Sequence, residues 1–327
     1  MRICVPVLLL LASCSAGDPP SILEPAGPAA ERVERLWWPM LWISVAVFVV
    51  VAGMLVFAIL RSRKGTQTSL IRTEVRWGDP FIAIAGVFIP ALILGGVYIF
   101  SLSEMRGLAS DGADTDLSIE VIGHDWWWEV RYPDGTVTAN EIHIPVGEPV
   151  RLELTSADVI HSFWVPQLQV KTDQIPGRVN ESWLQADSPG RYRGQCAEFC
   201  GLQHTNMVVY VVADAPDDFE AWLANESSDA AEPVGNVAER GRDLFMESSC
   251  AGCHAIRGTE ASAEVGPDLT HLMSRETLGA GVLPMGPKEL IDFVTDPQGT
   301  KPGMSMPPSE LTDDELSAVI TYLQELR

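Results

Sequence analysis

The sequence predicts a multidomain membrane protein with a two-helix transmembrane hairpin, an all-β domain and an all-α domain. Two uncharged apolar runs lie in the first third of the chain, and each has the length of a membrane-spanning helix. Short segments rich in β-branched and aromatic residues follow, and helix-like segments close the chain. A length of 327 residues allows two or three domains.

The charge balance limits the possible partners. The formal net charge is −22, from 44 acidic and 22 basic residues. Contacts with nucleic-acid phosphates need clustered Lys and Arg, so no nucleic-acid partner is expected. From Pro216 onward, 21 acidic residues stand against 7 basic ones, which predicts a well-solvated acidic domain at the C-terminus.

Residues 1–13 are typical of a signal peptide, with Arg2, an apolar run too short to span a membrane, and then small residues. The ending Leu11–Cys14 resembles a bacterial lipoprotein cleavage box. It predicts cleavage before Cys14 and lipid attachment to its sulfur. The alternative is an ordinary signal peptide that happens to end at a cysteine. Residues 14–36 then form an external N-terminal segment.

The two apolar runs, residues 37–60 and 80–102, predict a transmembrane hairpin, since each can cross about 30 Å of hydrocarbon. Two buried helices of a soluble protein would be the alternative, but runs of this length argue against it. The loop of residues 61–79 carries five basic residues, Arg61, Arg63, Lys64, Arg72 and Arg76. Basic loops stay in the cytoplasm, so both termini are expected outside. Pro90 is expected to kink the second helix.

Residues 110–215 predict an antiparallel sandwich or barrel. Segments such as "LSIEVIG", "WWWEVRY" and "PVRLELTS" have strand composition, and turn formers such as Pro133-Asp134-Gly135 separate them. Alternate strand residues face opposite sides, so at most two of Trp126, Trp127 and Trp128 share a face. One or two of these tryptophans are expected in the core.

The stretch "CAEFCGLQHTNM", residues 196–207, holds Cys196, Cys200, His204 and Met207, and His161 lies upstream in "SADVIHSFWVP". Thiolates, imidazoles and a thioether favour copper or zinc over hard cations. Two Cys and two His complete a tetrahedral zinc site but leave Met207 without a role. Two copper ions that share both thiolates would use all five side chains. Spacing alone leans towards copper and leaves both metals open.

Residues 224–236 are rich in Ala, Ser, Glu and Pro and predict a flexible linker. Residues 237–327 contain "CAGCH", the C-x-x-C-H signal for attachment of c-type haem. Cys250 and Cys253 would bond to the haem vinyl groups, and His254 would bind the iron. A redox-active cysteine pair is the alternative, but it would not need the histidine. The sixth iron ligand is expected downstream, in "KPGMSMPP".

The last helix is predicted from Thr312 and Glu315, which form a capping box, and from an apolar stripe. The stripe consists of Leu316, Val319, Ile320 and Leu323. It is expected to pack against the helix that precedes the haem motif. Three further histidines are expected to be surface or hydrogen-bonded imidazoles, namely His124, His143 and His271.

Several of these segments resemble known families. "HSFWVPQLQVKTDQIPGR", "CAEFCGLQHTNM", "GHDWWWEVRY" and the paired apolar runs resemble subunit II of haem–copper respiratory oxidases, over roughly residues 35–215. The C-terminal region resembles small bacterial cytochromes c, whose P-G-x-x-M-P pattern selects Met306 over Met304 as the axial ligand. The implied fold class is a two-helix transmembrane hairpin, a cupredoxin-like all-β domain and an all-α cytochrome c domain.

The resemblance implies a dinuclear copper (CuA) centre. Cys196 and Cys200 would be the bridging thiolates, and His161 and His204 the two imidazole ligands. The thioether of Met207 and the backbone carbonyl of Glu198 would complete the ligand set. The side chain of Glu198 would also reach a magnesium ion shared with subunit I. Trp126 would be the electron-entry residue.

Two positions depart from the family pattern. Asp125 stands where the family usually has a glutamine, before the tryptophans. Ala83 lies near the place where many relatives carry a glutamate at the mouth of a proton channel. Asp79 is only a weak substitute, so no proton-entry residue is assigned.

The resemblance implies the electron-input subunit of a cytochrome c oxidase in a bacterial inner membrane, with copper and haem domains in the periplasm. Electrons would pass from its own haem to the copper centre and on to subunit I, which reduces oxygen and pumps protons. Expected partners are subunit I, other oxidase subunits, and a donor such as a quinol–cytochrome c reductase or a soluble cytochrome. The alternatives are the same module of a nitric oxide reductase, or a zinc-stabilised lipoprotein with an independent cytochrome. A nitrous oxide reductase would need more histidines than the six present.

Overall fold

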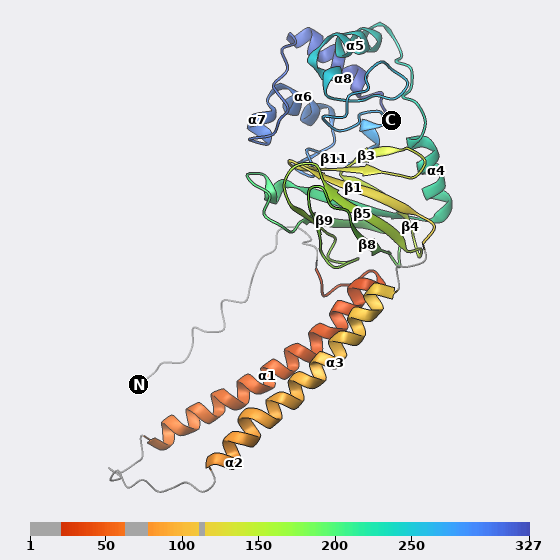
Figure 1. The fold of residues 1–327 in the computed structure, drawn as a ribbon. Helices are drawn as coiled ribbons and strands as arrows, with labels where there is room; N and C mark the ends of the chain where they lie inside the picture. The colour runs from red at the N-terminus through yellow and green to blue at the C-terminus, as the bar shows by residue number, and fades with distance from the viewer. Residues whose placement is uncertain (1–20, 63–77, 111–114) are drawn as a thin grey trace.

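The computed structural model describes residues 21–62, 78–110 and 115–327. A long helical hairpin leads to a β domain, and a C-terminal helical domain sits on the opposite side of the β domain (Figure 1). The predicted fold class is therefore confirmed. The signal peptide, the lipidation of Cys14 and most of the basic loop lie outside the described residues, so they stay predictions.

The hairpin consists of one long helix, followed by an antiparallel return segment made of three helical parts. These are α1 (Pro28–Ser62), then α2 (Gly78–Ala83), a π-helical turn (Ile84–Phe88) and α3 (Ile89–Ser110). Helices α1 and α3 lie side by side. Both spans are long and apolar enough to cross a membrane, and their most apolar stretches are not buried within the protein. Helix α1 extends beyond the predicted span of residues 37–60 at both ends.

The π-helical turn directly precedes Pro90, where the sequence predicts a kink. Proline has no N–H to donate to the carbonyl four residues earlier, so the regular hydrogen-bond ladder is interrupted there. The N–H of Ile89 donates to the carbonyl of Ile84, five residues back, which is the π-helical pattern. The irregular turn is thus placed by the proline that follows it.

The β domain consists of two five-stranded sheets, ordered β3-β2-β1-β5-β8 and β4-β10-β9-β6-β7. The strands are β1 (Ser118–His124), β2 (Trp127–Arg131), β3 (Val137–Ala139), β4 (Glu141–Pro145), β5 (Val150–Ser156), β6 (His161–Trp164), β7 (Thr172–Gln174), β8 (Asn180–Leu184), β9 (Gly190–Cys196) and β10 (Val208–Asp214). Most strand pairs are antiparallel, as the sequence predicts, but β1 pairs with β5 and β4 pairs with β10 in parallel. Long connections join each of these pairs, and only such connections permit parallel pairing.

The core of the β domain lies between the two sheets. Ile119 and Val121 on β1 and Leu152 and Leu154 on β5 are fully buried, in alternation with more exposed residues. Of the three adjacent tryptophans, only Trp128 is completely buried. The expectation that one or two of them belong to the core is confirmed.

The C-terminal domain follows α4 (Pro216–Glu226), which packs on β4 and β10. Its helices are α5 (Asn236–Glu247), α6 (Pro287–Thr295), α7 (Pro297–Thr300) and α8 (Asp313–Leu323). Helices α5 and α8 approach closely at Gly241, where a Cβ atom would lie 2.0 Å from the carbonyl oxygen of Ala318. The capping box at Thr312 and Glu315 and the burial of the apolar stripe on α8 are both confirmed.

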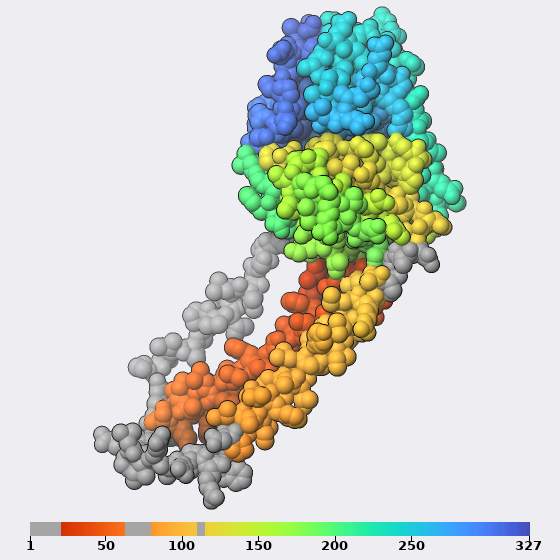
Figure 2. Space-filling view, viewed as in Figure 1, coloured from red at the N-terminus to blue at the C-terminus, as the bar shows by residue number. Residues whose placement is uncertain are grey.

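The connection between the two domains is attached to the C-terminal domain along its length. The first three residues of the predicted linker belong to α4. Beyond them, the amide of Ala230 donates to the carbonyl of Arg257, and the amide of Val234 donates to Glu325. The C-terminal domain rests directly on the β domain (Figure 2).

Candidate metal centre

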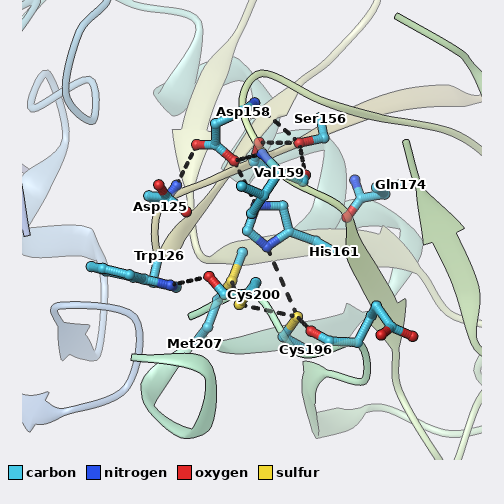
Figure 3. Close-up of polar contacts among 12 residues, drawn as sticks. Asp125, Trp126, Ser156, Asp158, Val159, His161, Gln174, Cys196, Cys200 and Met207 are labelled. Carbon is cyan, nitrogen blue, oxygen red and sulfur yellow. Dashed lines mark hydrogen bonds and ion pairs between the residues drawn. The ribbon is translucent and has the colours of Figure 1, made fainter. Parts of the chain in front are cut away.

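Five donor side chains converge at one end of the second sheet. Cys196 ends β9, Met207 immediately precedes β10, and Cys200 and His204 lie in the loop between these paired strands. His161 begins β6, which pairs with β9 so that Phe163 lies opposite Cys196. Strand pairing thus brings a histidine next to a cysteine that lies 35 residues further along the chain (Figure 3).

The two cysteine sulfurs occupy the middle of the cluster, 3.7 Å apart. On one side of the pair, Cys196 Sγ lies 3.9 Å from His161 Nδ1 and 3.1 Å from the carbonyl oxygen of Glu198. Ligand atoms of His161, Cys196 and Cys200 all lie within 4.8 Å of one another.

On the other side of the pair, Cys200 Sγ lies 3.6 Å from His204 Nδ1 and 3.9 Å from Met207 Sδ. His204 does not join the three-residue group around Cys196. The donors are therefore arranged in two halves that share the sulfurs. Cys196 and Cys200 are buried, and Met207 is fully buried, so the soft donors are shielded from water.

Asp158 orients His161. Its Oδ1 lies 2.8 Å from His161 Nε2, which leaves Nδ1 facing the cysteine. Burial raises the pKa of Asp158, but hydrogen bonds from His161 and from the amides of Val159 and Asp125 outweigh it and hold that pKa below its usual value. Burial lowers the pKa of His161, but hydrogen bonds with Asp158 and Cys196 outweigh it and raise that pKa to about 9. The carboxylate therefore stays charged and keeps the ring in place.

The surroundings of the two cysteines favour a thiolate at Cys196 and a protonated thiol at Cys200. The hydrogen bond from Cys200 and the contact with His161 outweigh burial and lower the pKa of Cys196 to about 3. Sharing its proton with Cys196, together with burial, raises the pKa of Cys200. The thiolate is the form that binds metals, and metal binding displaces the remaining protons. The cluster thus has the charge and the soft donors that a copper or zinc ion requires.

Trp126 lies directly beside the cysteine loop. Its indole Nε1 donates to the carbonyl oxygen of Cys200 at 2.8 Å. The Glu198 side chain points to the surface, where it lines an open depression of about 530 Å³ together with Val159, Ile160 and the exposed ring of Phe199. The loop therefore has one face towards Trp126 and another towards solvent.

The C-x-x-C-H motif forms a compact turn in the C-terminal domain. Cys250 lies in the 3-10 turn Ser249–Gly252, and the amide of His254 donates to the carbonyl of Cys250. His254 Nδ1 donates to the carbonyl oxygen of Pro267 at 2.7 Å. A carbonyl can only accept, so Nδ1 carries the proton and Nε2 keeps its lone pair for a metal. Burial lowers the pKa of His254, which also favours the neutral, ligating form.

The two candidate methionines differ in their surroundings. Met306 packs against the core of the C-terminal domain, as Cys250 does. Met304 does not belong to that set of packed residues. Both side chains are partly exposed. The packing favours Met306 as the axial ligand predicted from the sequence.

The other histidines behave as expected. His124 contacts Glu129, His143 contacts Asp214, and His271 lies between two backbone carbonyls. Sequence reasoning missed Asp158 and Lys301. Asp158 stands three residues before His161, which was a usable signal. Lys301 lies next to Trp126 only because two domains meet there.

The chain matches two family models. One is "Cytochrome C oxidase subunit II, periplasmic domain", over residues 135–214, and the other is "Cytochrome c", over residues 238–327. Among curated proteins, it is 33% identical to cytochrome c oxidase subunit 2 of Alkalihalophilus pseudofirmus, covering 98% of this chain and 94% of that protein. The Bacillus subtilis protein of the same name is 30% identical, with 98% and 95% covered.

Among solved structures, the crystal structure of the periplasmic domain of subunit II of cytochrome oxidase of Bradyrhizobium japonicum is 33% identical to the chain. The match covers 35% of this chain and 96% of that one, with a TM-score of 0.34.

Asp158→Asn is expected to weaken metal binding about 10–100-fold, because an amide cannot hold the proton of His161 Nε2 as a carboxylate does. Metal retained by the purified protein would be measured against a graded series of chelator concentrations. Asp116→Asn, at an exposed position, is the matched control and should behave as the unchanged protein. Equal retention by both variants would show that Asp158 does not support the site.

Proposed function

The chain belongs to the cytochrome c oxidase subunit 2 family, and from this we propose that it feeds electrons to its oxidase from two carriers of its own. As a family member, it is a membrane-bound part of a haem–copper oxidase complex and associates with subunit I. In the proposed path, electrons go from a c-type haem on the C-terminal domain to a CuA centre in the β domain. They then pass to subunit I, which reduces oxygen and pumps protons.

The observation that carries this proposal is the place of Trp126 between the two candidate sites. Its indole donates to the carbonyl of Cys200, in the copper loop, which comprises residues 196–207 between β9 and β10. The same ring faces Gly303, which stands three residues before Met306 in the C-terminal domain. One aromatic side chain is therefore hydrogen-bonded to the copper loop and lies beside the segment that carries Gly303 and Met306, which supports its role as the electron-entry residue.

The residues that would hold copper fit a two-ion centre better than a single zinc. A tetrahedral zinc needs four donors around one point. Here His161 lies on the Cys196 side of the sulfur pair, and His204 and Met207 lie on the Cys200 side. Bound copper would supply one-electron storage. The buried strands around it hold the donors in place, so little rearrangement is needed when the charge changes.

The residues that would hold haem are Cys250 and Cys253 as the covalent anchors and His254 and Met306 as the axial pair. Both cysteines are free thiols. His254 is already oriented by its hydrogen bond to Pro267. Bound haem would supply a one-electron carrier whose potential depends on this axial pair.

We further place subunit I against the exposed face of the copper loop. Val159, Ile160 and Phe199 are exposed apolar side chains around the depression lined by Glu198. An apolar rim with one carboxylate suits a protein partner and a shared magnesium ion. The two soluble domains and both termini would lie in the periplasm. A lipid on Cys14 would add a further membrane anchor. The acidic C-terminal domain would receive electrons from an upstream cytochrome or reductase.

Metal analysis tests the assignment of the two carriers. The purified chain is expected to contain two copper ions and one haem, with a spin-resonance signal delocalised over both coppers. Cys196→Ser and Cys200→Ser should each remove that signal and leave the haem in place. One zinc ion without a delocalised copper signal would contradict the proposal and support the zinc-stabilised lipoprotein.

Met306→Leu is expected to change the haem absorption spectrum and to lower the haem reduction potential, because the thioether ligand is lost. Met304→Leu is the matched control and should leave both unchanged. The spectrum and a redox titration would be recorded on the full chain. A shift in the Met304 variant alone would move the axial role to Met304.

Substrate consumption by the purified complex tests the final acceptor. Oxygen uptake with reduced donor is expected, and it should fall when Cys196 is replaced by Ser. The two curated relatives compared above are both oxidase subunits, which favours oxygen over nitric oxide. Consumption of nitric oxide without oxygen uptake would instead identify the nitric oxide reductase module.

A further inference from the structure

Lys301 is almost completely buried, at 2% exposure, although it belongs to a strongly acidic domain. Its Nζ donates to the carbonyl oxygens of Trp126 at 2.7 Å, Asn206 at 2.8 Å and Gly279 at 2.7 Å. These three carbonyls satisfy all three donors of an ammonium group. No carboxylate forms an ion pair with Lys301 within the described parts of the chain.

The three carbonyls come from both domains. Trp126 and Asn206 belong to the β domain, and Asn206 immediately precedes Met207 of the copper loop. Gly279 belongs to the C-terminal domain, like Lys301 itself, which directly follows the short helix α7. The ammonium therefore lies where the copper loop and Trp126 meet the segment of residues 301–306 in the C-terminal domain. Burial lowers the pKa of Lys301 to about 7. The three carbonyls accept from the ammonium in place of the water that it has lost.

Two glycines lie beside the Trp126 ring, one in each domain. A Cβ atom on Gly201, in the copper loop, would lie 3.2 Å from the ring, and one on Gly303 would lie 3.5 Å from it. Gly303 also has φ +88°, a conformation that residues with a side chain rarely adopt. The ring thus lies beside both segments, at positions where a larger residue would meet it, and Lys301 binds the main-chain carbonyl of the same tryptophan.

Other contacts join the same two domains. Gln203 Nε2 donates to the carbonyl of Pro302 at 2.7 Å, and the amide of Val208 donates to the carbonyl of Ala280 at 3.1 Å. Farther from the copper loop, Arg191 on β9 pairs with Glu276 across the interface and with Glu141 within the β domain. Lys301 differs from all of these because it is a buried charge held by three backbone carbonyls.

We propose that Lys301 is a positioning residue for electron entry, which fixes the C-terminal domain and Trp126 against the copper loop. The chain then works as one docked unit, and the donor does not swing on its tether. This inference rests on the proposed electron path for its functional consequence. The docking itself can be tested without any electron transfer.

The first test is the rate of electron transfer within the complete oxidase complex. A photochemical reductant would reduce the haem, and the absorption of haem and copper would be followed in time. Lys301→Met keeps an unbranched side chain that is one atom shorter and cannot donate. Transfer from haem to copper should slow at least about tenfold, because losing even one of the three buried hydrogen bonds weakens docking by about that factor. Direct reduction of copper by a small reductant should be unchanged.

The matched control is Lys288→Met, which removes an exposed lysine of the same domain. It should transfer electrons as fast as the unchanged protein. Copper and haem contents are measured on each variant, and Lys301→Gln replaces Lys301→Met if the latter lacks either group. Equal rates for the Lys301 and Lys288 variants would overturn the proposal.

The second test separates docking from electron transfer. A protease recognition sequence placed at residues 231–233 allows the connection to be cut in the full chain. After cleavage, the C-terminal domain should remain bound in the unchanged protein and in Lys288→Met, and should separate in Lys301→Met. Retention in all three would overturn the docking role. Normal docking without any transfer in the unchanged protein would instead overturn the proposed electron path.

Discussion

The pairing of β9 with its two neighbouring strands is the constraint on which the candidate copper site depends. Pairing with β6 sets Phe163 opposite Cys196 and so brings His161 to the first cysteine. Pairing with β10 closes the loop, and the amide of Cys196 donates to the carbonyl of Met207. Because both pairings belong to one sheet, donors distant in sequence share one rigid frame. A shift in strand register would separate them.

The second constraint is the contact between the two soluble domains. The β domain contributes Trp126 and the copper loop, and the C-terminal domain contributes Lys301 and Gly303. Neither domain completes this junction alone. Lys301 and Gln203 form hydrogen bonds across the junction, and Gly201 and Gly303 leave room beside the indole ring. Trp126, which lies between the two candidate carriers, therefore takes part in both the packing and the hydrogen bonding of this junction.

Local motifs in the sequence were enough to predict the membrane hairpin, the capping box and the class of each domain. They also singled out five side chains that the structure brings close together, because thiolates and imidazoles at short spacing have few other uses. The parallel strand pairs could not be predicted, since they depend on long connections. Lys301 could not be predicted either, because its acceptor at Trp126 lies 175 residues away, in another domain. A lysine has no local pattern that distinguishes a buried position from a solvated one.

The position of Gly303 beside Trp126 also affects which other proteins can reach the indole ring. The C-terminal domain occupies the approach to the indole ring, so a soluble carrier protein would have to compete with a permanently attached occupant for that place. Because the occupant is part of the same chain, dilution does not weaken it. Under the proposed electron path, an outside carrier would deliver its electrons to the C-terminal domain, and the strongly acidic surface of that domain would favour a basic carrier.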